Sequence, residues 1–301
     1  RGLRFIRRAF FSGYRKEIMM NETGQKKIAM INSMAGYGRC SITAAIPVLS
    51  ALKVQCCPAP TAILSNHTGY PSCYFDDYTE GLAPYLEEWK ELQFSFDAVM
   101  TGFLGSAGQV RTAVDFLMEV KPQGTKVLVD PVLGDNGTLY RTCTQELCEE
   151  MRELIQYADV ITPNLTEACL LTETPWSETG WSKNRLADLA YKLLFMGPGA
   201  VVLTGAAKSH SISNVVLERG KEPVFFTGKR VETSRHGTGD VFSAVLAGEM
   251  GHSVPLEEAV RRAATFTRKC VERSEELQIP EKEGLCIEEC LPYLFRLSRR
   301  D

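Results

Sequence analysis

The sequence predicts an α/β protein built on one mostly parallel sheet with helices on both faces. Short apolar runs alternate with amphipathic helical segments between residues 26 and 204, a pattern typical of parallel sheets covered on both sides. From residue 211 to residue 233 the pattern changes to short alternating strands with Gly-Lys turns, which predicts a small antiparallel edge or flap. A chain of 301 residues, 44% of them hydrophobic, is long enough for one large core.

Each element rests on its period and on the residues that bound it. The expected strands are short runs of Val, Ile, Leu, Ala and Met, at residues 26–33, 54–64, 96–101, 126–130, 159–162 and 200–204. The expected helices show a 3.6-residue period, at residues 41–53, 79–92, 109–120, 144–157, 166–171, 185–195, 240–250, 255–273 and 287–297. A glycine-bearing loop is expected at 34–39 and a polar loop at 65–72.

Residues 1–25 differ from the rest, and residues 26–301 are expected to form a single domain. Six basic side chains and three phenylalanines lie in the first 16 residues, a composition that suits a targeting arm or a short amphipathic helix. The alternative, which we expect, is a disordered or artefactual extension. A net charge of −3 and a pI of about 6.0 leave no basic field for nucleic acid. The apolar runs are much shorter than the ~20 residues of a membrane helix. The ten cysteines form no C-x-x-C pair and follow no secretory signal, which indicates reduced thiols in the cytoplasm.

The most informative stretch is Gly237-Thr238-Gly239-Asp240, which opens onto an apolar, Ala-rich run. That run predicts a buried helix beginning near Gly239, and the unpaired N–H groups at a helix N-terminus favour an anion. Asp240 adds a carboxylate in the same first turn. Phosphoryl transfer to a hydroxyl needs both an anion cradle and a base. The alternative is that Asp240 is only a cap or a partner of the helix dipole.

Polar residues also follow the carboxyl ends of the predicted strands, which is the edge where open α/β sheets bind ligands. They are Ser33, residues 65–68, residues 101–103, residues 130–135, residues 162–167 and Thr204. The segments from Asp130 to Asp135 and from Asn164 to Glu167 offer oxygen ligands that suit Mg²⁺. The alternatives are turn chemistry in the first segment and a helix cap in the second. We expect all of these groups to share one rim.

Two other phosphate-binding patterns are absent. The sequence Gly36-x-Gly38-x-x-Ser41 lacks the third glycine of a dinucleotide fingerprint, and no acidic residue ends the second strand. No P-loop pattern occurs either. The loop Ser65-Asn66-His67-Thr68-Gly69 is unusual at such a rim and predicts a site for a polar, ring-sized substrate. The alternative for His67 is a structural histidine.

Together these residues resemble the ribokinase-like superfamily, and within it the pyridoxal (pyridoxine, pyridoxamine) kinases. The superfamily pattern is Gly-Thr-Gly-Asp at 237–240 and Asn164-x-x-Glu167. The narrower pattern is the 65–69 loop, Asp-Pro-Val-Leu-Gly-Asp at 130–135 and Ile-Thr-Pro-Asn at 161–164, with Ser33 after the first strand. The resemblance covers residues 26 to about 275. It implies a ribokinase-like three-layer sandwich, a homodimer, and ATP-dependent phosphorylation of the 5′-hydroxymethyl group of pyridoxal, pyridoxine or pyridoxamine.

The resemblance also implies roles on the phosphate side of the site. Asp240 is similar to the base that takes the proton of the substrate hydroxyl, and the N–H groups of Gly237 and Gly239 are similar to the anion hole. The nucleotide and metal contacts that it implies are Asp130 and Glu167 for Mg²⁺, directly or through water; Asn164, Thr204 and Thr238 for the phosphates; and Asp135 and Thr162 for a monovalent cation such as K⁺.

On the substrate side the resemblance implies ring contacts from Ser33 and Thr68, with His67 beside them. Phe103 stands where many members have Tyr, so it can stack on a pyridine ring but donates no hydrogen bond. His236 stands where some relatives have a cysteine that reacts with an aldehyde, so covalent capture from that position is excluded. These departures leave the preferred vitamer open.

Two rival functions remain, one from the same superfamily and one from another class. A hydroxymethylpyrimidine kinase of thiamin synthesis shares the superfamily pattern, but the Ser65–Gly69 loop argues against it. A non-catalytic vitamin-binding protein would keep the fold, but it would not need the carboxylate of Asp240.

Overall fold

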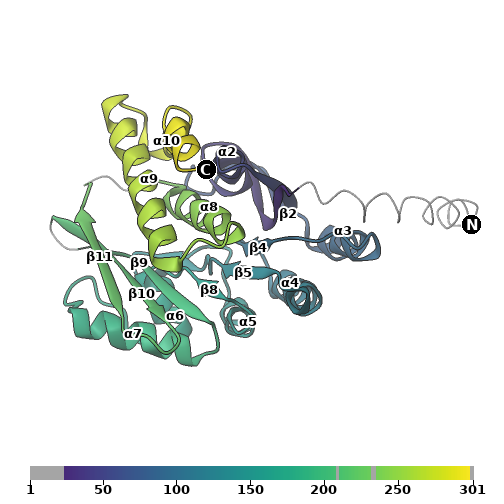
Figure 1. Ribbon diagram of the computed structural model, residues 1–301, viewed down its shortest axis with the longest axis horizontal. Coiled ribbons are helices and arrows are strands. Elements are labelled where there is room, and N and C mark those ends of the chain that lie inside the picture. The colour runs from purple at the N-terminus through teal and green to yellow at the C-terminus, as the bar shows by residue number, and fades with distance from the viewer. Residues whose placement is uncertain (1–23, 208–209, 232–234, 299–301) are drawn as a thin grey trace, which may run out of the picture.

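The computed structural model describes residues 24–207, 210–231 and 235–298, and its centre is a nine-stranded sheet (Figure 1). The strand order is β11-β10-β9-β8-β5-β4-β1-β2-β3. All neighbours from β9 to β2 are parallel, whereas β3 at one edge and β10 and β11 at the other are antiparallel. The predicted mostly parallel sheet with an antiparallel edge is therefore confirmed.

The strands of this sheet are β1 (Lys26–Tyr37), β2 (Val54–Asn66), β3 (Phe75–Asp77), β4 (Ala98–Thr101), β5 (Lys126–Val129), β8 (Val160–Ile161), β9 (Ala200–Ala207), β10 (Ser211–Glu218) and β11 (Val224–Lys229). A separate hairpin joins β6 (Gly134–Asp135) to β7 (Thr138–Leu139). The helices are α2 (Ser41–Ala51), α3 (Thr79–Glu91), α4 (Ala107–Val120), α5 (Gln145–Ile155), α6 (Leu165–Thr172), α7 (Lys183–Phe195), α8 (Thr238–Gly251), α9 (Leu256–Glu276) and α10 (Leu291–Leu297), with 3₁₀ turns η1 (Lys121–Gln123) and η2 (Glu281–Glu283).

The helices form two layers, one on each face of the sheet, which gives the predicted three-layer sandwich (Figure 1). Helices α3 to α7 pack on one face and α2, α8, α9 and α10 on the other. Strand β4 shows why the strands read as continuous apolar runs. Val99 enters one core, and its neighbours Ala98 and Met100 enter the other. A strand buried on both faces has no polar positions to alternate with.

Two local predictions are wrong, and two small features were missed. The expected loop at 34–39 is strand as far as Tyr37, because β1 stays paired with β2 up to Asn66 beyond a bulge between Asn32 and Met34. Strand β3 and the β6–β7 hairpin were not predicted, since two- and three-residue strands carry no period. Helix α10 begins at Leu291 rather than at residue 287. Almost all of the expected extension at 1–25 lies outside the described residues, as do residues 232 and 233 of the expected flap.

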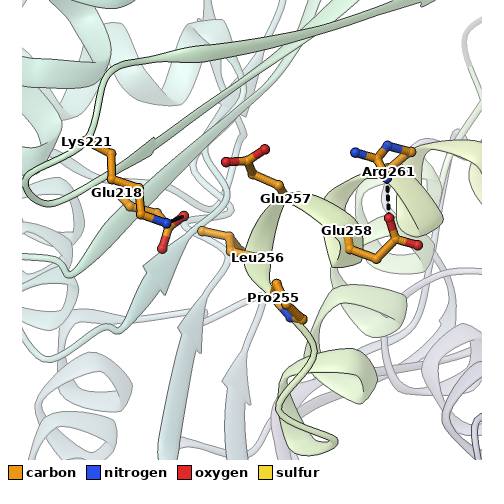
Figure 2. Close-up of a pocket in the computed structure, with 7 residues that line it drawn as sticks. All are labelled: Glu218, Lys221, Pro255, Leu256, Glu257, Glu258 and Arg261. Carbon is orange, nitrogen blue, oxygen red and sulfur yellow. Dashed lines mark hydrogen bonds and ion pairs between the residues drawn. The ribbon is translucent and has the colours of Figure 1, made fainter.

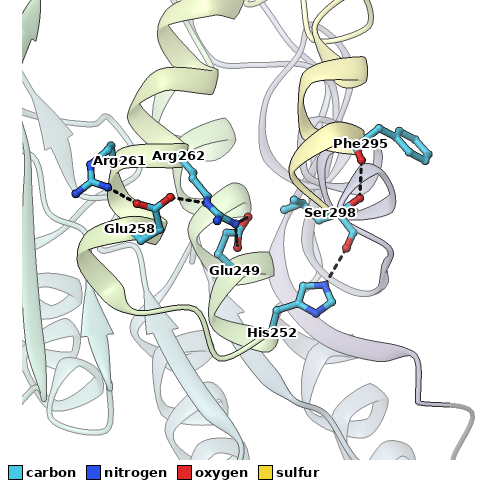
Figure 3. A network of polar contacts seen from close by, with 8 residues as sticks. Glu249, His252, Glu258, Arg261, Arg262, Phe295 and Ser298 are labelled. Carbon is cyan, nitrogen blue, oxygen red and sulfur yellow. Dashed lines mark hydrogen bonds and ion pairs between the residues drawn. The ribbon is translucent and has the colours of Figure 1, made fainter. Parts of the chain in front are cut away.

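Helix α8 is anchored by an ion-pair network that runs from a buried glutamate to the surface (Figure 3). Glu249, with no exposed surface, accepts hydrogen bonds from Nη1 of Arg262 on α9 at 3.2 and 3.1 Å. Arg262 also donates Nε to Glu258 at 2.9 Å, and Glu258 pairs with Arg261. At the end of α8, Nε2 of His252 lies 2.8 Å from the carbonyl oxygen of Leu52. Since a buried carboxylate persists only with such partners, the network holds α8 against α9 and α2.

Candidate active site

The first turn of α8 is an open anion site. Gly237 precedes it with φ +81°, and a Cβ there would lie 1.9 Å from the carbonyl oxygen of Arg39, so only glycine fits. The helical ladder begins with the N–H of Val241, which donates to the Gly237 carbonyl at 2.9 Å. Within the described part of the chain no hydrogen bond occupies the N–H groups of Thr238 and Gly239, so both are available to a ligand.

The loop that leads into this turn is held by a buried arginine. Arg235 is 7% exposed, and its Nη2 lies 2.7 Å from Oε1 of Glu275 on α9. Its Nη1 donates to the carbonyl oxygens of Ile279 and Gly284 at 2.8 and 3.3 Å. A guanidinium with this many fixed partners positions the start of α8 before any ligand arrives.

Asp240 lies in the same turn and is surrounded by donors. Nδ2 of Asn32 donates to Oδ1 of Asp240 at 3.3 Å. The backbone N–H of Ser41, a residue with φ +52°, donates to the same carboxylate. Burial raises the pKa of Asp240 above its usual value, while the bonds from Ser41 and Asn32 oppose the rise. The group is therefore a stronger base than an exposed aspartate, and its orientation is fixed.

Asp130 stands across from this turn at the end of β5. An added Cβ at Gly239 would lie 4.0 Å from Oδ2 of Asp130. Ser243, one helical turn beyond Asp240, donates its Oγ to the same Oδ2 at 3.0 Å. Burial, and then the charge of Asp240, raise the pKa of Asp130 to about 7. Two carboxylates that share a buried space in this way favour a bound cation.

Glu167 and Asn164 form a reciprocal capping box at the start of α6. Oδ1 of Asn164 accepts the Glu167 N–H at 3.0 Å, and Oε2 of Glu167 accepts the Asn164 N–H at 2.8 Å. Oε1 of Glu167 also accepts the N–H of Leu133 at 3.3 Å. Burial, followed by the charge of Asp130, raises the pKa of Glu167 well above its usual value. The capping role that the sequence left open is therefore real. The carboxylate of Glu167 is also close enough to Asp130 to interact with its charge.

Of the remaining residues predicted for the phosphate side, Thr204 and Thr162 lie at the rim, and Asp135 lies on the exposed hairpin. Thr204 joins the rim through a bridge to Asn164, and its N–H donates to the Pro163 carbonyl at 2.9 Å. Oγ1 of Thr162 is 3.1 Å from Ser243 Oγ and is buried. Asp135 is exposed on the β6–β7 hairpin, where it accepts hydrogen bonds from Asn136. No hydrogen bond between described residues joins Asp135 to Thr162.

The substrate side is formed by the bulge within β1 and by the loop that follows β4. Ser33 is 6% exposed and donates its Oγ to Ser41 at 2.9 Å, which leaves its oxygen able to accept. Phe103 is half-buried, and its ring meets Phe75 edge-on with centroids 6.4 Å apart. Ser33 and Phe103 are both linked to Asp240 through Asn32, which accepts their N–H groups and donates to that carboxylate.

His67 is committed to holding its own loop. Nδ1 of His67 accepts the N–H of Gly69 at 3.1 Å, so Nε2 carries the proton and donates to the Lys282 carbonyl at 2.6 Å. The ring of His236 lies over it with centroids 4.1 Å apart. Thr68 next to it is exposed. Any contact of a ligand with His67 therefore goes through the ring rather than through a ring nitrogen.

The sequence missed Asn32 and Ser243, both of which touch candidate carboxylates. Asn32 precedes Ser33 near the predicted end of the first strand, and that position beside Ser33 was the available signal. Ser243 lies within an apolar helix, and only the i, i+3 spacing from Asp240 could have indicated it.

Two hollows lie at the opposite, amino end of the strands. One of about 270 Å³ lies between the end of β10 and the start of α9, lined by Glu218, Lys221, Pro255, Leu256, Glu257, Glu258 and Arg261 (Figure 2). The other, about 520 Å³, is lined by the end of α2 and the start of β2, including Lys53 and Gln55. Neither is lined by a residue of the rim, so neither is the candidate site.

The fold and the rim define a kinase of the ribokinase-like superfamily. The profile of the family described as phosphomethylpyrimidine kinase matches residues 36–285. The chain belongs to this family.

Three relatives illustrate its neighbourhood. A pyridoxine/pyridoxal/pyridoxamine kinase from Bordetella avium is 32% identical over 251 residues, which are 79% of this chain and 82% of that one. A Bacteroides thetaiotaomicron protein named a phosphomethylpyrimidine kinase, crystallised with pyridoxal, is 36% identical with a TM-score of 0.85 and covers 89% of this chain and 95% of its own. The pyridoxal kinase of Leishmania donovani, in complex with ADP and pyridoxamine, is 26% identical with a TM-score of 0.81 over the same shares.

Proposed function

We propose that the protein transfers the γ-phosphoryl group of ATP to the 5′-hydroxymethyl group of pyridoxal, pyridoxine or pyridoxamine. The observation that carries this proposal is the carboxylate of Asp240 in the same helical turn as uncapped N–H groups, beside a seat bounded by Ser33 and Phe103. Relatives that bind pyridoxal, or pyridoxamine with ADP, support the choice of substrate.

The chain supplies a base and an electrostatic cradle for this transfer. Asp240 takes the proton of the attacking hydroxyl, and general-base catalysis of this kind contributes ~10²–10⁴ to the rate. The N–H groups of the first turn of α8 hold the transferring phosphoryl group, on which charge accumulates. Because Gly237 and Arg235 fix the turn in advance, little reorganisation is needed when the substrates bind.

Mg²⁺ fits the acidic side of the site. Oδ2 of Asp130 accepts a hydrogen bond from Ser243, and Asp130 lies close enough to Glu167 for its charge to raise the pKa of Glu167. In the described residues no three His, Cys, Asp or Glu side chains converge as a metal cluster. Mg²⁺ commonly takes one or two carboxylates and completes its shell with water and phosphates. We therefore assign Asp130 and Glu167 to Mg²⁺, which neutralises phosphate charge when bound.

Four further assignments extend this proposal. Asn164, Thr204 and Thr238 contact the nucleotide phosphates, and Thr68 and His67 border the pyridine ring. Asp135 and Thr162 belong to a K⁺ site near the phosphates. The protein acts as a homodimer in the cytoplasm, where its free cysteines stay reduced. No helix of the described residues is long and apolar enough to cross a bilayer.

The second candidate is a hydroxymethylpyrimidine kinase, which the description of the matching family favours. Both kinds of substrate carry a hydroxymethyl group on a heteroaromatic ring, so the chemistry of the site alone does not distinguish the two functions. The test is ATP consumption by the purified chain with pyridoxal, pyridoxine, pyridoxamine or hydroxymethylpyrimidine. We expect kcat/KM to be highest for a B6 vitamer. Turnover with the pyrimidine alone would select the second candidate, and turnover with none would indicate a binding protein.

A further inference from the structure

Asn32 lies between the substrate seat and the base. The residue is 1% exposed and lies within β1, at the bulge just past the last residue paired with β4, and its amide meets three groups from three segments. Its Oδ1 accepts the N–H of Ser33 at 2.7 Å and the N–H of Phe103 at 2.9 Å. Because two N–H groups point at that atom, it must be the oxygen, and the other end of the amide must be Nδ2.

The fixed amide aims its donor at Asp240. Nδ2 lies 3.3 Å from Oδ1 of Asp240, and no alternative rotation of the amide satisfies the Ser33 and Phe103 donors. Gly102 makes room for this arrangement. A Cβ at Gly102 would lie 2.3 Å from Nδ2 and 2.5 Å from Cγ of Asn32, so any larger residue would displace the amide.

We propose that Asn32 is a positioning residue that sets the orientation of the Asp240 base and ties it to the backbone of the substrate seat. This inference rests on the proposed phosphoryl transfer, and it adds a residue that acts through Asp240 rather than on the substrate. A 1 Å displacement of a catalytic group costs on the order of 10²-fold in rate, so a fixed donor on the base has a measurable effect.

Asn32→Asp is the most informative substitution. It keeps an oxygen for the Ser33 and Phe103 N–H groups, removes the donor to Asp240 and places a second carboxyl against it. We expect kcat with pyridoxal to fall ~10- to 100-fold. The KM for pyridoxal should change less than ~3-fold, because the backbone of the seat keeps its acceptor.

A double-mutant cycle separates positioning from support of the fold. If Asn32 acts through Asp240, adding Asn32→Asp to Asp240→Asn lowers kcat by less than ~3-fold further. Thr61→Val is the matched control, because Thr61 is fully buried and donates to the Phe103 carbonyl at 2.7 Å without bonding to Asp240. Thr61→Val should raise the KM and lower kcat. Each of these two changes should be equally large whether residue 240 is Asp or Asn.

Thermal stability gives a readout that needs no substrate. In the double variant Asn32→Asp/Asp240→Asn the amide and the carboxylate exchange places, so the bond between positions 32 and 240 re-forms with its donor reversed. We expect the Tm of the double variant to exceed that of Asn32→Asp. Equal losses of kcat in both backgrounds, or no recovery of Tm in the double variant, would overturn the inference. Absence of turnover by the unmodified protein would instead reject the proposed function, and the Tm comparison would still decide the contact.

Discussion

Ser243 donates its hydroxyl to Asp130 at 3.0 Å from a position one helical turn beyond Asp240. One face of α8 therefore carries both the candidate base and the group that orients the carboxylate facing it. The ion pair between Glu249 and Arg262 fixes the same helix from its other end. The positions of Asp240 and Asp130 are thus coupled through a single rigid element.

Replacement of Ser243 by Ala should weaken the metal side of the site. The change removes a donor to a buried carboxylate, which costs ~1–3 kcal/mol of stability. It also raises the pKa of Asp130 further, so we expect the Mg²⁺ concentration for half-maximal rate to increase severalfold. Mg²⁺ titrations of the rate at constant ATP measure this. Ser213→Ala, which removes an exposed hydroxyl pair with Thr227, is the control. Identical titrations for Ser243→Ala and the unmodified protein would separate Ser243 from the metal site.

The pKa of Asp130 predicts how Mg²⁺ stabilises the protein at different pH values. Burial raises this pKa from 3.8 to about 7, so the folded chain holds the proton more tightly than the unfolded chain. The free energy of unfolding therefore falls as pH rises from 3.8 to about 7. A cation on the ionised carboxylate offsets that loss, so Mg²⁺ should raise the Tm more at pH 8 than at pH 5.

Two controls apply to this pH dependence. One is the variant Asp130→Asn, and the other replaces Mg²⁺ with NaCl at matched ionic strength. The variant should lose the pH-dependent part of the Mg²⁺ effect. An equal Mg²⁺-induced shift of Tm at pH 5 and pH 8 in the unmodified protein would contradict the assignment of Asp130.

Gly237→Ala should disrupt the anion cradle. The new Cβ would lie 1.9 Å from the Arg39 carbonyl, and the residue would keep a φ of +81° that strains any side chain. We expect both a lower Tm and a fall of kcat by ~10²-fold, as is typical when an oxyanion donor is displaced. Gly220→Ala is matched for strain, because its φ is +82° with no atom within 4 Å of the added Cβ. It should lower the free energy of unfolding by ~1 kcal/mol or less, with kcat unchanged. Similar kinetics for the two variants would remove Gly237 from the cradle.

Glu167→Gln should affect Mg²⁺ dependence and stability together. A neutral amide is a poorer partner for a cation, and it cannot accept from both Asn164 and Leu133 as the carboxylate does. We expect a rightward shift of the Mg²⁺ titration and a loss of stability of ~1 kcal/mol from the capping box. Glu146→Gln, a first-turn glutamate that is exposed on α5, controls for the dipole term. Superimposable titrations would leave Glu167 with a capping role alone.

Sequence reasoning located the rim because strand ends and helix starts have local signals. The apolar run before Asp130 and the Gly-Thr-Gly-Asp stretch at the start of α8 can each be recognised from a few consecutive residues. The strand order depends on contacts between distant parts of the chain, so no local signal predicts it. The pairing of β1 with β2 past Met34 was also missed, because the glycines in residues 34–39 indicated a loop.

Asn32 and Ser243 were not predicted as site residues, for a related reason. Each is an ordinary polar residue in its own segment, and its role comes only from a partner 208 or 113 positions away in the chain. His67 shows the converse. The sequence placed it at the rim, while its contacts with Gly69 and Lys282 show that its nitrogens shape the loop.

The central claim is that Asp240 is the base of a phosphoryl transfer, and Asp240→Asn tests it most directly. The variant keeps the size of the side chain and the start of α8, but it cannot accept a proton. With pyridoxal and ATP we predict that kcat falls by ~10²–10⁴-fold. Binding of ATP, measured by calorimetry, should change little. A variant that keeps near-full kcat would show that Asp240 only caps the helix, and the proposed mechanism would be contradicted.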